Sequence, residues 1–152
     1  MLNYKNKSYI KLIALSLMIG VLLSLCITVV SAVTWTAGPI LSFTVWGTNY
    51  QAQNEIWVSQ NTAFAYTLIR SANLQIMPIG YMGAVAYLYT SGGAMVAWSD
   101  WWYNSIATNY MSRLTFGVSN PGTYFSSGFV RAFNGNGYTT REPNRTPNMA
   151  IR

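Results

Sequence analysis

The stretch FVRAFNGNGYTT, residues 129–140, predicts two antiparallel strands joined by a tight turn. Phe129, Arg131 and Phe133 alternate with smaller apolar residues, which is the period of a strand that buries one face. The Asn-Gly-Asn-Gly run that follows tolerates positive φ angles, so the chain can reverse direction there. Tyr-Thr-Thr at 138–140 then forms a last short strand. Strand and turn explain this stretch, and the alternative is a loop whose amides and arginine bind sugar hydroxyls.

The same alternation recurs along the chain. It is present at residues 41–45, 64–68, 74–76 and 114–118. Ser-Gly-Gly at 91–93 separates two further strands at 84–89 and 94–98, and Asn-Pro-Gly at 120–122 marks another turn. Residues 98–112 predict a strand followed by a loop. About seven or eight short strands at this spacing predict an all-β fold, a single antiparallel β-sandwich or small barrel.

The first 32 residues have the layout of a secretory signal peptide. Three lysines precede an apolar stretch at 12–30, and Val-Ser-Ala at 30–32 supplies the small residues that a signal peptidase reads. Cleavage after Ala32 gives a secreted, extracellular protein. An uncleaved apolar helix over residues 12–33 is long enough to anchor the chain in the cell membrane instead. In both cases the rest of the chain is expected outside the cell.

The exported part forms one domain of modest charge. The sole cysteine, Cys26, lies in the leader, so the domain depends on packing without a disulfide. Six arginines and three acidic residues give the 120 residues after the leader a net charge of +3, without a dense basic patch, so nucleic acid is not an expected partner. We assign the β domain to residues 33–140. Residues 141–152 combine two prolines with three arginines and are interpreted as a C-terminal tail.

The available side chains restrict catalysis. The chain has no histidine, and the exported part has no cysteine or lysine, which removes the usual bases, nucleophiles and metal ligands. Its only acids are Glu55, Asp100 and Glu142. A pair of Glu55 and Asp100 is the one possible acid–base constellation, and a solvated strand-edge glutamate and a turn aspartate are the simpler interpretation. We therefore expect no enzymatic activity, no metal and no cofactor.

Aromatic side chains are abundant in the exported part, which has six Trp, nine Tyr and six Phe after the leader. The alternation predicts that the core takes up Phe43, Phe64, Tyr66, Phe116 and Phe129. Adjacent residues of an extended chain point to opposite faces, so the Trp101-Trp102-Tyr103 run must expose at least one ring. The candidate ligand-binding residues are Trp98, Trp101, Trp102, Tyr103, Arg131, Asn134, Asn136 and Tyr138.

A resemblance accompanies these residues. The run GYMGAVAYLY…GAMVAWSDWWYNS, followed by PGTYFSSGFVRAFNGNGYTT and TPN, resembles small exported all-β proteins of Gram-positive bacteria. The resemblance covers roughly residues 80–148 and rests on turn and strand motifs. It implies a bacterial exported protein and supplies no catalytic residues. This chain differs from that pattern in its many tryptophans and methionines.

Two kinds of function can use exposed rings on an exported domain. The first is a non-enzymatic binding domain, whose partner is a cell-envelope glycan or another surface protein. In that case contact with the membrane is expected only through the N-terminal segment. The alternative is a membrane-active or bacteriocin-like antimicrobial protein, in which Trp and Tyr lodge at the headgroup level.

Overall fold

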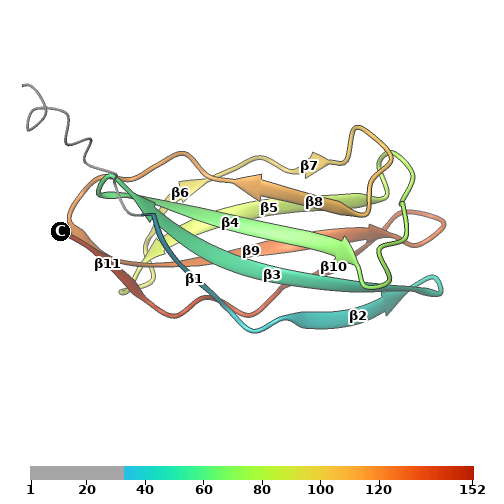
Figure 1. Ribbon diagram of the computed structural model, residues 1–152, viewed down its shortest axis with the longest axis horizontal. Helices are drawn as coiled ribbons and strands as arrows, with labels where there is room; N and C mark the ends of the chain where they lie inside the picture. Colours follow the sequence, from blue (N-terminus) through green and yellow to red (C-terminus); the bar gives the residue numbers. More distant parts are fainter. Residues whose placement is uncertain (1–32) are drawn as a thin grey trace, which may run out of the picture. The chain divides into compact units, whose positions relative to one another are not determined.

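The computed structural model describes residues 33–152 as strands and connecting loops (Figure 1), and the predicted signal segment 1–32 lies outside the described residues. The strands are β1 Thr34–Ala37, β2 Leu41–Val45, β3 Thr48–Ser59, β4 Thr62–Ser71, β5 Met82–Thr90, β6 Met95–Trp98, β7 Trp102–Tyr103, β8 Tyr110–Leu114, β9 Gly122–Phe133, β10 Tyr138–Arg141 and β11 Met149–Ile151. Within this range no helix is long and apolar enough to cross a bilayer.

The strands form two antiparallel sheets that pack face to face, which confirms the predicted all-β sandwich (Figure 1). Sheet I has the order β1-β3-β4-β8. Strand β2 pairs with the same edge of β3 as β1 does, but nearer the start of β3. Sheet II has the order β10-β9-β5-β6, with β11 added on β9 and β7 added on β5. The long strands β3, β4, β5 and β9 form the centre of the sandwich.

The core lies between the inner faces of these four long strands. Its large buried side chains include Tyr50, Ile56, Ile69, Met82, Leu88 and Val130. Alanines also face inward, among them Ala65 on β4 and Ala86 on β5, and these small side chains let the sheets approach closely. The described buried members of both core clusters fall between Val45 and Ile151, so the compact unit Ala32–Arg152 has a hydrophobic core of its own and we expect it to fold independently.

The predicted aromatic core is largely wrong, because β4 and β9 turn their larger rings outward. On β4 the buried positions are Ala63, Ala65, Thr67, Ile69 and Ser71, and Phe64 and Tyr66 lie on the other face. On β9 Val130 is buried and Phe129 points outward, while Phe116 is 55% exposed. Phe43 alone packs partly against the core. Alternation defines two faces but does not say which face is inside.

Most predicted strands and turns are present at the expected positions. Strand β2 matches residues 41–45, β5 and β6 form the predicted hairpin, and β9 and β10 flank the Asn-Gly turn. Residues 74–76 are a loop rather than a strand, with Leu74 at φ 57° and both apolar side chains exposed. Of the predicted strand at 114–118, only Leu114 belongs to a strand, as the last residue of β8, and Val118 forms an isolated bridge to Ala63 of β4.

The prediction of a C-terminal tail was wrong, because the segment after β10 is an integral part of the domain. Strand β11 pairs with the start of β9, and Ile151 is buried. Thr146 is also buried, and its Oγ1 accepts a hydrogen bond of 2.9 Å from the backbone N–H of Ser126. From sheet I, the buried amide of Asn54 donates to the carbonyl of Pro143 at 2.9 Å. The segment therefore closes one side of the sandwich by bonding to both sheets.

The alkaline limit of stability should depend on Tyr66. Burial raises the pKa of its hydroxyl to about 12 from the ordinary value of 10.0, at which the unfolded chain loses the proton. Because the folded state keeps this proton longer, the stabilisation is complete below pH 10 and is lost as the pH rises toward 12. Urea unfolding at increasing pH should show this decline, and Tyr66→Phe should make it shallower. Equal slopes for both proteins would contradict the assignment.

Candidate binding face

The outer side of sheet II is lined by rings, and we call it the aromatic face. On β9, Phe125, Phe129 and Arg131 occupy alternate positions and therefore share one side of the sheet. On the neighbouring β5, Tyr87 and Tyr89 face the same way, because Tyr89 is paired with Phe125. Six residues of strand separate Phe125 from Arg131, so the face extends for about 20 Å along β9.

One end of the aromatic face is a rigid group that we call the arginine platform. It consists of Trp101, Tyr103, Arg131 and Tyr138. The Arg131 guanidinium carbon lies 4.0 Å from the centroid of the Trp101 ring. Its Nη1 donates to the Tyr103 hydroxyl at 2.6 Å, and the Tyr138 ring packs on Tyr103 with centroids 4.9 Å apart. The cation of Arg131 thus contacts two aromatic side chains, and Tyr138 packs on the second of them.

Gly83 explains how Tyr103 reaches Arg131. Strand β7 is paired with β5, and Arg131 lies beyond β5 on β9, with Gly83 between them in the register. A Cβ atom on Gly83 would approach the Tyr103 ring to 2.8 Å, so the ring lies flat across the glycine. The Tyr138 hydroxyl donates to the carbonyl of Gly80 at 2.8 Å, which fixes the other end of the platform.

A chain of ring contacts continues along the face from Phe129 to Phe125. Tyr87 meets Phe129 edge-on with centroids 6.1 Å apart and also contacts Tyr89 at 6.3 Å. Tyr89 stacks on Phe125 at 5.3 Å with an angle of 13° between the ring planes. The face is therefore a continuous apolar track with hydroxyl groups at intervals.

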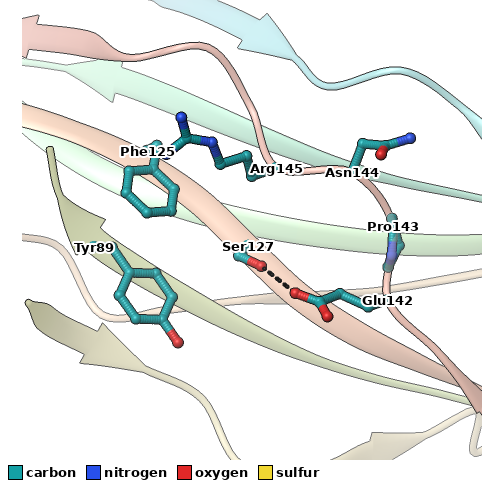
Figure 2. A pocket seen from close by; sticks show the side chains of 7 residues that line it. All are labelled: Tyr89, Phe125, Ser127, Glu142, Pro143, Asn144 and Arg145. Atoms are coloured by element: carbon teal, nitrogen blue, oxygen red, sulfur yellow. Dashed lines mark hydrogen bonds between the residues drawn. The ribbon is translucent and has the colours of Figure 1, made fainter. Parts of the chain in front are cut away.

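The other end of the aromatic face opens into a pocket of about 430 Å³, which we call the C-terminal pocket (Figure 2). It is lined by Tyr89, Phe125, Ser127, Glu142, Pro143, Asn144 and Arg145. Figure 2 shows Tyr89 and Phe125 on one side and Glu142 reaching in from the other. The Ser127 hydroxyl donates to a Glu142 carboxylate oxygen at 3.3 Å, and the Arg145 guanidinium carbon lies 4.7 Å from the Phe125 centroid.

Tyr89 is a hydrogen-bond donor in the lining of this pocket. A tyrosine hydroxyl is protonated in the neutral range already at its ordinary pKa. Burial raises the pKa of Tyr89 above that value, and the neighbouring Tyr87 and Glu142 raise it further, because each disfavours a second negative charge. Together with the carboxylate of Glu142 and the amide of Asn144, the pocket offers both donors and acceptors.

Four of the eight residues proposed from sequence come together in the arginine platform, namely Trp101, Tyr103, Arg131 and Tyr138. Trp98 and Trp102 do not join them. The Trp98 ring packs edge-on against Phe116 with centroids 5.6 Å apart. Trp102 points away from Tyr103, and the Arg113 guanidinium carbon lies 5.4 Å from its centroid. Both tryptophans therefore lie at the side of the sandwich where β6 and β7 approach β8.

Asn134 and Asn136 shape the turn between β9 and β10. The Asn134 amide donates to the Thr139 hydroxyl at 3.3 Å, and its carbonyl oxygen accepts from the backbone N–H of Asn136 at 3.2 Å. These contacts build the turn that was proposed as the structural interpretation of this stretch.

Most residues of the C-terminal pocket were not predicted from the sequence. Phe125, Ser127, Phe129 and Arg131 form an i, i+2 series that could have indicated a lined outer face. Glu142 and Arg145 gave no comparable signal, because they were assigned to a tail.

Acidic groups are dispersed over the domain. Glu55 is on the outer side of sheet I, where its carboxylate accepts from the Trp57 Nε1 at 2.7 Å, and Asp100 lies beside sheet II between β6 and β7. The proposed acid–base pair is thus divided between the two sheets. Within residues 33–152, no three His, Cys, Asp or Glu residues are grouped to hold a metal ion. Comparisons with protein-family models, curated proteins and solved structures find no match for this chain.

Proposed function

We propose that this protein is an exported, non-enzymatic binding domain that holds a cell-envelope glycan on the aromatic face of sheet II. The observation that carries the proposal is the series of rings on the outer side of sheet II, in which the contacts from Phe129 to Phe125 lie between the arginine platform and the C-terminal pocket. A pyranose ring has an apolar face that stacks on aromatic side chains and a rim of hydroxyls that needs donors and acceptors. The aromatic face supplies both along about 20 Å, which is long enough for several sugar units.

The rings are already held in place before binding, so the ligand has to order few side chains. Arg131 is fixed by Trp101 and Tyr103, and Tyr89 is stacked on Phe125. Side chains that are ordered before binding lose little conformational entropy when the ligand arrives. Tyr and Trp suit this role because a large contact area depends on only two torsion angles.

The charges of the face favour a ligand of low net charge. Arg131 already has a ring and a hydroxyl as partners, and Arg145 lies over Phe125 in the same pocket as Glu142. A strongly anionic ligand would find one acidic group in its path and few cations that are not already engaged. A neutral or amino-substituted glycan fits this distribution better than a nucleic acid or a polyphosphate.

The test compares two adjacent tryptophans. Residues 33–152 and the variants Trp101→Ala and Trp102→Ala are incubated with insoluble cell-wall material, and the retained fraction is measured. Trp101→Ala should reduce retention roughly tenfold, because it removes a stacking ring of the arginine platform. Trp102→Ala should bind as the parent does, because its ring lies off the aromatic face.

Circular dichroism and thermal unfolding of both variants serve as the control for folding. Phe129→Ala, in the middle of the track, should lower retention in the same way as Trp101→Ala. Equal retention of the parent, Trp101→Ala and Phe129→Ala would refute the proposal, as would an equal loss in Trp102→Ala.

A further inference from the structure

Sheet I carries a second group of exposed and half-buried apolar side chains on its outer side, which we call the tryptophan patch. It consists of Val33, Trp35, Trp57, Phe64, Tyr66 and Leu114. The strand register places Trp35 beside Trp57 and Trp57 beside Phe64, so these rings form a row across β1, β3 and β4. In the next row Tyr66 is paired with Leu114 of β8.

This patch is exposed although it is among the most apolar surfaces of the domain. Trp35 is 57% exposed, Val33 53% and Leu114 47%. A groove of about 310 Å³ is lined by Val33, Trp57, Ser59, Phe64, Tyr66 and Leu114. A contiguous apolar surface of this kind on an exported domain indicates a contact with a membrane or with another molecule.

The position of the patch along the chain identifies the membrane as its occupant. Val33 is part of the groove, and in the sequence only Ser31 and Ala32 separate it from the apolar stretch 12–30. Trp35 is two residues further on, which corresponds to about 7 Å of extended chain. A membrane span over this stretch would therefore end close to the patch in the sequence.

The chemistry of the patch also fits the boundary between lipid tails and headgroups. Trp and Tyr side chains favour this region because an apolar body carries a polar end. The Trp57 Nε1 already donates to Glu55 at 2.7 Å, and the Tyr66 hydroxyl bonds to the Tyr110 hydroxyl, so these polar ends are satisfied before contact. The patch contains no basic residue, which points to apolar insertion rather than attraction to anionic headgroups.

We propose that the tryptophan patch docks on the lipid surface and holds sheet I against the membrane from which the domain is exported. The aromatic face is on the outer side of the other sheet, so docking leaves it directed away from the lipid. The inference rests on sheet I and on the apolar stretch that precedes it in the sequence, and it does not require that the aromatic face binds a glycan.

The experiment measures partitioning of residues 33–152 onto phosphatidylcholine vesicles by flotation. Added phosphatidylglycerol and added salt should change the bound fraction little, because the contact is apolar. The double variant Trp35→Gln/Leu114→Gln should weaken partitioning by roughly tenfold or more, since it removes two exposed apolar side chains. Trp102→Gln is the matched control, because Trp102 is 53% exposed at a different side of the sandwich.

Three results would overturn the proposal. They are no partitioning of the parent domain, equal partitioning of the double variant, and a dimer in analytical ultracentrifugation that Trp35→Gln/Leu114→Gln dissociates. The last result would assign the patch to a second copy of the chain. The double variant should keep its retention on cell-wall material, and Trp101→Ala should keep its partitioning onto vesicles, so the two proposals fail independently.

Discussion

Truncation after Arg141 is expected to unfold the β domain. It removes β11 from the edge of β9 and takes away the buried side chains of Pro143, Thr146 and Ile151. It also leaves the Asn54 amide without the two backbone carbonyls, those of Pro143 and Asn144, to which it donates. Lost apolar burial and a stranded buried amide together cost several kcal/mol, which is comparable with the roughly 5–15 kcal/mol stability of a whole domain.

The point variant Asn54→Ala removes the hydrogen bonds that anchor this segment but keeps the segment itself. Asn54 is fully buried, donates to the Pro143 carbonyl at 2.9 Å and accepts from the Thr67 hydroxyl at 2.7 Å. Its removal should lower the free energy of unfolding by about 2–3 kcal/mol, because the Pro143 carbonyl and the Thr67 hydroxyl lose a buried hydrogen-bond partner. Urea unfolding measures the loss. Asn136→Ala, at the exposed hairpin tip, should change stability by less than about 0.5 kcal/mol.

A folded truncated chain with an unchanged melting temperature would show that residues 142–152 are a tail after all. The same truncation also tests the site, because four walls of the C-terminal pocket come from residues 142–145. Asn54→Ala should therefore weaken binding at the aromatic face as well as stability.

The sequence located most strands but could not determine which side of each faced the core. A period of two is the same for both sides of a strand, and bulk suggested that Phe64 and Tyr66 were inside. The sheets approach too closely for those rings, because Ala65 and Gly128 line the narrow gap between them. The spacing between two packed sheets depends on residues far apart in the chain, so no local pattern reports it.

The candidate site, like the fold, could be predicted from the sequence only in part. An excess of rings near residue 101 indicated that at least one must be exposed, and Trp102 is 53% exposed. Trp101 and Tyr103 are half-buried and form part of the arginine platform. Their meeting with Arg131 depends on the pairing of β7 and β9 with opposite sides of β5. The pairing of β11 with β9 could not be predicted from the sequence, because the two prolines that precede β11 gave no strand signal.

Gly128→Ala is expected to destabilise the domain by about 3 kcal/mol or more. Gly128 lies in the middle of β9 and faces sheet I. A Cβ atom there would stand 2.1 Å from the Thr67 hydroxyl oxygen and 2.3 Å from the backbone carbonyl of Val85. The first contact could be relieved only by moving β4, and the second only by distorting the ladder between β5 and β9. A methyl group at this point therefore separates the sheets.

Urea unfolding of Gly128→Ala and of the double variant Thr67→Ala/Gly128→Ala tests this geometry. The double variant should remain destabilised, because the Val85 carbonyl is still in the way and the Asn54 side-chain oxygen has lost the Thr67 hydroxyl. Gly92→Ala is the control, since its nearest neighbour would be the Thr90 hydroxyl at 3.8 Å. A Gly128→Ala protein as stable as the parent would mean that the sheets are further apart at their centre than the structure places them.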